Sequence, residues 1–240
     1  MKVMILCGGR GIRLNEETAF KPKPMVMVGE RPIVWHIMKL YSHYGFNDFV
    51  LCLGYRGDMI RAYFDNPAHK EPQWNVQCVN TGESAETGTR IMRAASFLGN
   101  DEKFMLTYGD GVADVDIKKL VDFHNEHNKA LTVTAIKPPS PFGVLEIDGH
   151  TVTSFAEKQR SKDWTSGGFM VCNRSVLDLL SDDEKCIFEQ GPVQELSRRG
   201  ELAAYKHEDF WHCVDTLKHL EGLNAFHSRG ERPWMVWERA

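Results

Sequence analysis

Several features that decide the class of a protein are missing from this sequence. No apolar run approaches the roughly 20 residues of a membrane-spanning helix, and the first residues lack the pattern of a signal peptide. Basic residues are not in excess, because the formal net charge is −4, so no overall positive field attracts nucleic acid. Internal repeats and low-complexity tracts are also missing. We therefore expect no membrane and no nucleic acid among the partners of this chain.

Cysteine pairs with a functional spacing are also missing. The six cysteines show no Cys-x-x-Cys motif, which argues against a zinc site or a redox pair. Cys7, Cys52, Cys78 and Cys172 lie in or beside apolar segments. We expect buried free thiols, and therefore a cytoplasmic location, where thiols stay reduced.

What is present is the composition of an ordinary globular domain. The 240 residues are 42% hydrophobic and 26% charged, which suffices for one sizeable core. Strands are expected over residues 2–7, 49–53, 75–79, 104–108 and 131–136. Helices are expected over residues 32–44, 57–64, 89–98 and 117–127. This alternation predicts an α/β fold with a doubly wound, mostly parallel, Rossmann-like sheet, whose ligands bind beyond the carboxyl ends of the strands.

The pattern changes after about residue 137. Pro138-Pro139-Ser140-Pro141 interrupts regular structure, and the residues that follow predict a short hairpin over 142–155. A strand is expected over 167–172 and helices over 175–180, 188–198 and 216–227. We predict a single domain, 1–240, made of two unequal parts that meet near residue 137.

A glycine-rich turn follows the first predicted strand, Gly8-Gly9-Arg10-Gly11-Ile12-Arg13-Leu14. Without a Cβ, glycine lets backbone N–H groups approach a ligand closely. The turn is not a P-loop, because no Gly-Lys-Ser/Thr follows, and its spacing differs from Gly-x-Gly-x-x-Gly. The glycines alone fit a tight strand-to-loop turn equally well.

A second motif, Lys21-Pro22-Lys23-Pro24, lies ten residues further along. Each proline fixes φ and favours extended backbone in the residue before it. The two lysines therefore lie in a stiff segment and point in alternate directions. Cationic side chains beside exposed N–H groups suit a nucleoside triphosphate, and a pair of surface cations is the alternative.

Together the two motifs resemble the signature of the sugar-1-phosphate nucleotidylyltransferases, Gly-Gly-x-Gly-Thr-Arg-Leu followed by Pro-Lys-Pro. Further segments follow in that family's order: Tyr108-Gly109-Asp110-Gly111, Glu157-Lys158, Gly167-Gly168-Phe169 and Val214-Asp215-Thr216. Residues 21–26, 35–39, 41–45, 108–117 and 200–211 resemble one branch, the glucose-1-phosphate cytidylyltransferases.

The resemblance implies a nucleotidyltransferase of the GT-A-like fold. Residues 1–137 would bind the nucleotide, and residues 138–240 would form a small sugar-binding β-subdomain. The implied reaction moves a cytidylyl group from CTP to a sugar 1-phosphate, here α-D-glucose 1-phosphate. The products are pyrophosphate and a CDP-sugar for surface polysaccharide such as lipopolysaccharide. The resemblance also implies a homo-oligomer.

Both reactants are anionic, so catalysis needs charge neutralisation and in-line positioning more than a protein nucleophile. By resemblance, Arg13 contacts the β- and γ-phosphates, and Lys23 contacts the α-phosphate and the attacking oxygen. Asp110 and Asp215 hold Mg²⁺, a cation suited to carboxylate and phosphate oxygens. Arg13, Lys23 and Asp110 are the expected catalytic residues. The expected nucleotide-binding residues are Leu6, Gly8, Gly9, Arg10, Gly11, Arg13, Lys23, Gly88, Arg90 and Gly109.

Gly143, Glu157, Lys158 and Gly168 are expected, again by resemblance, to contact the sugar phosphate. Two of these assignments have plain alternatives. Asp110 beside glycine is also typical of a turn in which Asp bonds its own backbone. Glu157 and Lys158 also fit an ordinary solvated ion pair.

The sequence departs from the family pattern at four positions, which are Ile12, Ala85, Gln159 and Ser166. Ile12 and Ala85 leave UTP or dTTP open as the nucleotide. Gln159 and Ser166 leave another sugar or polyol phosphate open as the acceptor. A non-catalytic nucleotide-sugar sensor is a further alternative, disfavoured because the set Arg13, Lys23, Asp110 and Asp215 is intact.

Other polar and apolar residues have structural interpretations. His124 and His127 share the face of a predicted helix, which we expect to be solvated. His207 and His212 are expected to pack, and Asp116 to cap the helix that follows it. The apolar segment 233–237 is expected to pack on its own domain or on a neighbouring subunit.

Overall fold

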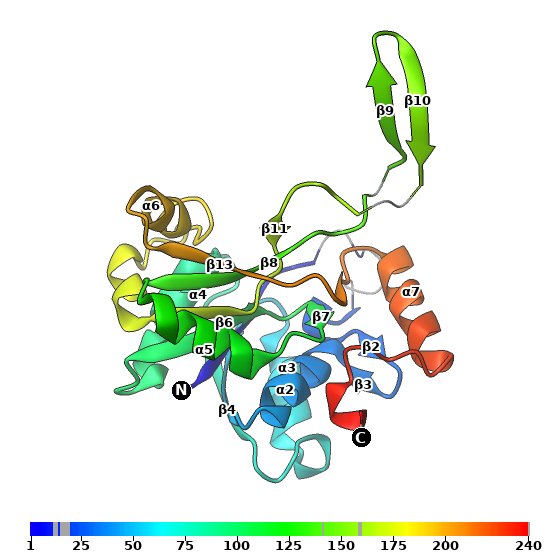
Figure 1. The fold of residues 1–240 in the computed structure, drawn as a ribbon. Coiled ribbons are helices and arrows are strands. Elements are labelled where there is room, and N and C mark those ends of the chain that lie inside the picture. The colour runs from blue at the N-terminus through cyan, green and yellow to red at the C-terminus, as the bar shows by residue number, and fades with distance from the viewer. Residues whose placement is uncertain (12–13, 15–19, 141, 158–159, 240) are drawn as a thin grey trace.

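The structure is a computed structural model that describes residues 1–11, 14, 20–140, 142–157 and 160–239 (Figure 1). Five residues named above lie outside the described residues: Ile12, Arg13, Pro141, Lys158 and Gln159. The roles expected of Arg13 and Lys158 therefore stay predictions.

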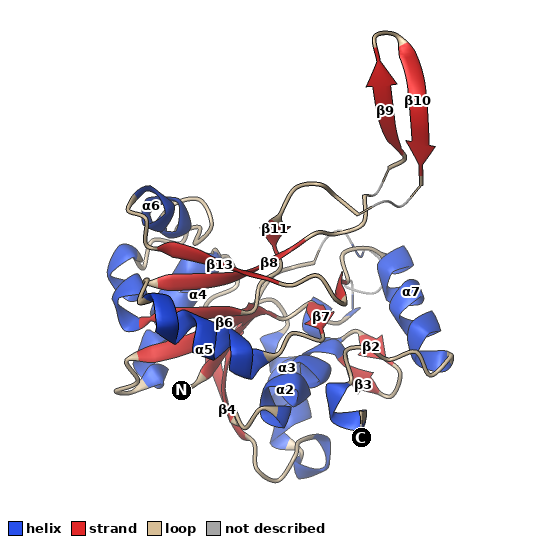
Figure 2. Cartoon of the chain, viewed as in Figure 1, coloured by secondary structure: helices blue, strands red, loops and turns tan. Residues whose placement is uncertain are grey.

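A sheet of eight strands forms the centre of the molecule (Figure 2). Its spatial order is β11 (Thr165–Ser166), β8 (Leu131–Ile136), β12 (Met170–Asn173), β6 (Lys103–Tyr108), β1 (Val3–Cys7), β4 (Asp48–Leu53) and β5 (Asn75–Asn80), and β13 (Leu202–Lys206) also pairs with β8. Strands β6, β1, β4 and β5 are parallel, whereas β12 is antiparallel to both of its neighbours. The predicted α/β fold with a mostly parallel sheet is confirmed.

The two faces of the sheet are covered by separate hydrophobic cores. Val3, Ile5 and Cys7 of β1 point into one core, and Met4 and Leu6 point into the other, because successive strand residues face opposite sides. The first core is completed by α2 (Ile33–His43), α3 (Gly57–Asp65), α5 (Ile117–His127) and α7 (Leu217–Ser228). The second is completed by α4 (Thr87–Ala94), η4 (Ala95–Leu98), η5 (Arg174–Leu179) and α6 (Pro192–Arg198).

Several short strands and 3₁₀ helices accompany the central sheet. The pair β7 (Gly111–Ala113) and β14 (Trp211–Cys213) is antiparallel, as is the pair β2 (Met27–Val28) and β3 (Arg31–Pro32). Three of the short 3₁₀ helices are η2 (Lys23–Met25), η3 (Pro67–His69) and η6 (Val236–Glu238).

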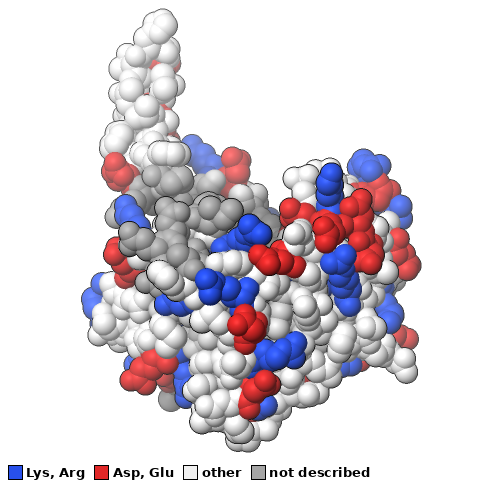
Figure 3. All heavy atoms as spheres, turned by 180° about the vertical axis from the view of Figure 1, so that it is seen from behind, with Lys and Arg blue, Asp and Glu red and all other residues white. Residues whose placement is uncertain are grey.

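A long hairpin, β9 (Val144–Asp148) and β10 (Thr151–Ala156), extends away from the body of the molecule (Figure 1). It forms its own two-stranded sheet, as predicted from the residues around it. Its apolar side chains are largely in solvent, with Leu145 47%, Ile147 62%, Val152 51% and Phe155 63% exposed. The face of the hairpin seen in Figure 3 shows few charged side chains, unlike the mixed charges on the same side of the body.

Several predicted elements are shifted in the structure. Of the helix predicted over 188–198, only Pro192–Arg198 is α-helical, and the segment predicted over 175–180 is a 3₁₀ helix. The strand predicted over 167–172 is limited to Met170–Asn173. None of the described helices combines the length and hydropathy required to cross a membrane.

His124 corrects the prediction of a solvated helix face. Its side chain is buried and its ring bonds with Thr132 Oγ1 at 2.8 Å and with Asn173 Oδ1 at 3.0 Å. The histidine faces β8, which supplies Thr132, and β12, which supplies Asn173. Burial is tolerated there because both ring nitrogens have hydrogen-bond partners. A histidine is read from sequence as polar, although a fully bonded imidazole packs well in a core.

Three smaller predictions are confirmed. The Asp116 carboxylate accepts from the backbone N–H of Lys119 and caps α5. Segment 233–237 packs on its own domain, where the buried Trp234 indole N–H donates to His36 Nδ1. None of the six cysteines forms a disulfide; Cys7, Cys52 and Cys172 are buried as expected, whereas Cys78 is only half-buried because its strand lies at the edge of the sheet.

Candidate active site

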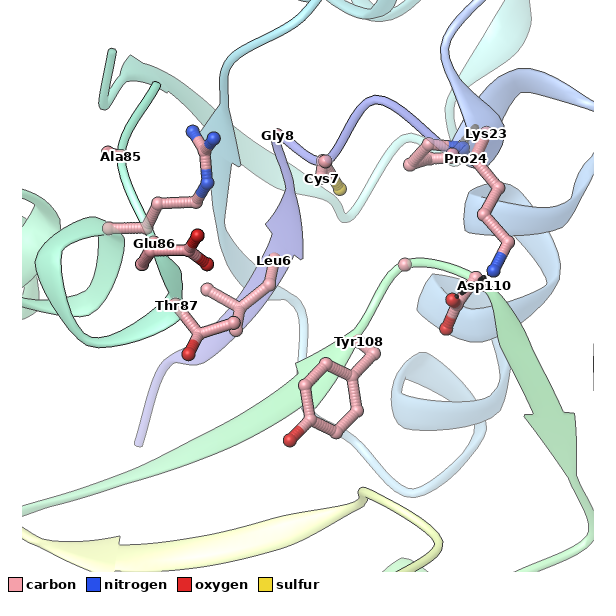
Figure 4. Close-up of a pocket in the computed structure, with 14 residues that line it drawn as sticks. Leu6, Cys7, Gly8, Lys23, Pro24, Ala85, Glu86, Thr87, Tyr108 and Asp110 are labelled. Carbon is pink, nitrogen blue, oxygen red and sulfur yellow. Dashed lines mark hydrogen bonds and ion pairs between the residues drawn. The ribbon is translucent and has the colours of Figure 1, made fainter. Parts of the chain in front are cut away.

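A pocket of about 250 Å³ opens at the carboxyl ends of β1 and β6 (Figure 4). Its lining comprises Leu6, Cys7, Gly8, Gly9, Gly11, Lys23, Pro24, Ala85, Glu86, Thr87, Arg90, Tyr108, Gly109 and Asp110. This is the edge at which a parallel sheet binds ligands. Figure 4 shows the end of β1 between the start of α4 on one side and the Lys23–Asp110 pair on the other.

A second pocket of about 240 Å³ adjoins the first. It is lined by Thr107, Tyr108, Asp110, Gly111, Ser166, Gly167, Gly168, Phe169, Trp211, Cys213 and Asp215. Tyr108 and Asp110 belong to both pockets. Two compartments that share a carboxylate are suited to two reactants that meet there.

Lys23 lies at the junction of the two pockets. Its ammonium contacts Asp110 Oδ2 at 2.6 Å and Asp215 Oδ1 at 2.7 Å. Burial alone would lower the pKa of Lys23, but hydrogen bonds and charge from the two carboxylates outweigh burial and raise it. The lysine therefore stays cationic at neutral pH and can neutralise a phosphate.

The proline motif explains how Lys23 comes to lie there. Pro22 is extended, with φ −69° and ψ 148°, and Pro24 occupies the first turn of η2. Pro24 Cγ would lie 3.0 Å from a Cβ on Gly109, so the two segments pack closely. The stiffness predicted for the Lys-Pro-Lys-Pro segment thus holds the ammonium beside the β6 turn.

Three side chains offer ligand atoms for a metal ion. Oxygens of Asp110 and Asp215 and the Cys213 sulfur lie within 4.8 Å of one another. Cys213 ends β14 and Asp215 lies two residues further on, where the N–H of Val214 donates to Asp110 O at 2.9 Å and holds this segment beside Asp110. Two carboxylates exceed the formal charge of the Lys23 ammonium, so the cluster favours a further cation. Carboxylate oxygens suit Mg²⁺, which also keeps waters or substrate phosphates as ligands.

The glycine turn is shaped by Arg90 from α4. A Cβ on Gly8 would lie 2.1 Å from Arg90 Nη1, so only glycine fits against this side chain. The buried guanidinium donates to Thr81 Oγ1 at 3.0 Å, Gly82 O at 2.6 Å and Glu83 O at 3.2 Å. These bonds hold Arg90 in place, so the turn cannot displace it. Gly9, in contrast, has open space where a Cβ would be.

Cys7 forms part of the pocket floor without offering a nucleophile. Burial raises the pKa of its thiol well above the usual value, and the charges of Cys52, Cys78 and Asp110 add to this effect. A protonated, buried thiol does not attack phosphorus. Among the described residues that line the pocket, Lys23 and Asp110 are better suited to act on a phosphate, and their catalytic roles stay predictions.

The sequence pattern of nucleotidyl transferases matches residues 2–228. This chain belongs to the nucleotidyl transferase family. It is 45% identical over 258 aligned positions to the glucose-1-phosphate cytidylyltransferase of Salmonella typhi, covering 99% of this chain and 100% of that protein. A mannose-1-phosphate guanyltransferase of Aspergillus oryzae is 31% identical, over 91% of this chain and 62% of the relative.

Solved structures share the fold of this chain. The crystal structure of HddC from Yersinia pseudotuberculosis has a TM-score of 0.71 and 21% identity, covering 94% of this chain and 99% of that one. The same protein complexed with GMP-PN gives a TM-score of 0.73 and 20% identity, covering 94% and 99%.

Most expected site residues of this nucleotidyl transferase line the two pockets. Those in the first pocket are Leu6, Gly8, Gly9, Gly11, Lys23, Arg90, Gly109 and Asp110. Gly168 and Asp215 line the second. Arg90 is turned toward backbone carbonyls of the 81–83 loop, so its contact with a base stays a prediction.

Four expected site residues do not line either pocket. Gly88 faces Cys186, whose sulfur would lie 2.6 Å from a Cβ, and Gly143 faces the Phe155 ring at the base of the hairpin. Arg10 is exposed and pairs with Glu83 at 3.1 Å. Glu157 follows β10 and is exposed. Their substrate contacts remain predictions.

Sequence reasoning missed three residues of the site. Tyr108 is shared by the two pockets, although the sequence pointed to it only as the end of a strand and the first residue of the Tyr108-Gly109-Asp110-Gly111 motif. Cys213 was not considered as a ligand, because no second cysteine or histidine is spaced with it. Trp211 lines the second pocket and donates from its indole N–H to Gly167 O at 2.8 Å. The sequence signal for Trp211 was its position just before the Val214-Asp215-Thr216 motif.

Proposed function

We propose that this protein transfers a cytidylyl group from CTP to α-D-glucose 1-phosphate, forming CDP-glucose and pyrophosphate. The observation that carries the proposal is the junction of the pockets, where Lys23 contacts Asp110 and Asp215. Identity of 45% to the Salmonella typhi cytidylyltransferase, over nearly the full chain, supports the choice of nucleotide and sugar.

The residues at the junction suit an in-line displacement. Lys23 would neutralise charge that develops on the α-phosphate and the attacking phosphate oxygen. N–H groups of the glycine turn would approach the triphosphate, since the space beside Gly9 is open. The second pocket, beside Gly168, would hold the sugar phosphate. Asp110 and Asp215 would hold Mg²⁺, which supplies further charge neutralisation when bound.

The proposal includes a homo-oligomer in the cytoplasm. The hairpin exposes apolar side chains of both strands, and an isolated hairpin is marginally stable in water. A second copy of the chain would cover these side chains. The free cysteines are compatible with a reducing compartment.

A second candidate is the same chemistry on different substrates. Ala85 lines the first pocket and Ser166 the second, and both depart from the pattern of the cytidylyltransferase branch. UTP or dTTP as nucleotide, or another sugar or polyol phosphate as acceptor, would suit these changes. A sensor without turnover is disfavoured, because the lysine and both carboxylates are present.

The test is pyrophosphate release with Mg²⁺, using CTP, UTP, dTTP, ATP and GTP, each with and without glucose 1-phosphate. Release with CTP and glucose 1-phosphate together is the expected result. Release with another nucleotide or acceptor would support the second candidate. Binding of CTP with no release for any acceptor would support a sensor.

A further inference from the structure

A hydrogen-bond network behind the first pocket joins two distant parts of the chain. The Tyr108 hydroxyl donates to Glu189 Oε1 at 2.5 Å, and the Thr87 hydroxyl donates to Glu189 Oε2 at 2.6 Å. The backbone N–H of Phe188 donates to Thr87 Oγ1 at 2.9 Å. One carboxylate thus fastens two residues of the pocket wall, which Figure 4 shows on either side of Leu6.

Glu189 belongs to a loop, residues 181–191, that lies along the start of α4. The N–H of Glu86 donates to Glu184 O at 2.9 Å, and the N–H of Gly88 donates to Cys186 O at 2.8 Å. The helix has no side-chain cap, so this loop replaces one. It also explains Gly88, since a Cβ there would overlap Cys186.

Tyr108 is held at its ring as well as at its hydroxyl. A Cβ on Gly168 would lie 3.0 Å from Tyr108 Cδ2, so the ring packs directly on the Gly167–Gly168 turn. At the other end of the ring the hydroxyl donates to Glu189 Oε1, so the side chain is held at two points.

We propose that Glu189 is a positioning residue that fixes the Tyr108 ring as the shared wall of the two pockets. The ring separates the space beside Thr87 from the space beside Gly168, so its position sets how closely two reactants approach over Asp110. This inference rests on the proposed function, because it assumes that one reactant occupies each pocket.

Misplacement of reactants lowers the rate of transfer more than it lowers binding. Tyr108→Phe keeps the ring and removes the donor, and Glu189→Gln keeps the shape and weakens the acceptor. We expect each variant to lower kcat about tenfold and to change the KM of either substrate less than about threefold. Because both variants weaken the same contact between Tyr108 and Glu189, the double variant should also lose about tenfold, not a hundredfold.

The experiment measures kcat, both KM values and the melting temperature for the wild type, the two single variants and the double variant. Glu184→Gln is the matched control, since its exposed side chain lies on the same loop outside the network. Turnover in Tyr108→Phe equal to the wild type, or losses that multiply in the double variant, would overturn the positioning role. A wild type inactive with every substrate pair would instead overturn the proposed function, and this inference with it.

Discussion

The cleft, meaning the two adjoining pockets around Lys23 and Asp110, and the β9–β10 hairpin are held together in opposite ways. In the cleft, Lys23 contacts carboxylates 87 and 192 positions away in the sequence, and both pockets are lined by residues from distant segments. In the hairpin, β9 has β10 as its one strand partner among the described residues, across the Gly149 turn. The cleft is thus held by the whole fold, whereas the hairpin is held by local pairing and leaves its apolar side chains in solvent.

This contrast indicates where a substitution should act. A change in the cleft alters charge that the surrounding fold holds in place, so it should affect chemistry with little loss of order. A change on the hairpin should affect neither the chemistry within one copy nor its folding. Substitutions and a change of pH should therefore have effects that differ between the cleft, the body and the hairpin.

Lys23→Ala should lower kcat by about a thousandfold, the order of effect seen when a charge-stabilising group is removed from a transition state. The circular dichroism spectrum should stay that of the wild type. Lys39→Ala is the control, because Lys39 pairs with Glu71 at 3.0 Å outside the two pockets. Full turnover in Lys23→Ala would contradict the role of the junction.

Acid should destabilise the body of the molecule through His36. Burial lowers the pKa of His36 to about 4, below the value of 6.5 in the unfolded chain. The Trp234 indole is only a donor, so the Nδ1 atom that it contacts must be an acceptor, as in the neutral ring. Folding therefore opposes protonation, and stability present above pH 6.5 is lost as the pH falls toward 4.

The size of this loss follows from the pKa difference and is about 3 kcal/mol. Urea unfolding of the wild type and of His36→Gln at pH 7.5, 5.5 and 4 would measure it. We expect the stability advantage of the wild type to shrink as the pH falls. If the difference in stability between the wild type and His36→Gln stayed constant with pH, His36 would not be the group that makes the fold sensitive to acid.

Cys213→Ser should change the choice of metal at the junction. A thiol binds soft cations better than Mg²⁺, so the variant should bind Cd²⁺ about tenfold more weakly. Calorimetric titration with Cd²⁺ measures this effect, and Mg²⁺-supported turnover should stay within about threefold. Cys186→Ser is the control, because Cys186 lies outside both pockets. Equal Cd²⁺ affinity in the two variants would mean that Cys213 is not a ligand.

The double variant Ile147→Glu, Val152→Glu should have the smallest effect on one copy of the chain. Both side chains are exposed, so the free energy of unfolding should change by less than about 0.5 kcal/mol. Light scattering should show loss of the homo-oligomer that we propose. A variant that is unfolded would contradict the expected stability. A variant whose assembly has the same mass as that of the wild type would contradict the role of the hairpin in the homo-oligomer.

Most helices and strands were predictable from the sequence, because the spacing of apolar residues and the length of each apolar segment decide them. The apolar runs at 49–53 and 104–108 are strands, and the helical spacing at 32–44 gives α2. The hairpin was predictable because Pro138 and Pro139 isolate it. The boundaries around 188–198 were not, since a loop there is stabilised by contacts with α4 rather than by its own pattern.

The site was predictable only where a motif marks it. Lys23, Asp110 and Asp215 were found by resemblance, but the contact of the ammonium with both carboxylates depends on tertiary packing. Glu189 carried no signal, because its partners are 81 and 102 positions away in sequence. Cys213 was missed for a similar reason, as a single cysteine becomes a ligand only when folding brings carboxylates to it.

The position of β12 between β8 and β6 affects how the sheet can form during synthesis. Strands β6 and β8 leave the ribosome earlier, yet β12 separates them and pairs with both. Until residue 173 has been synthesised, each of these strands presents an open edge to other chains. A nascent chain that stops near residue 137 should therefore aggregate or recruit a chaperone.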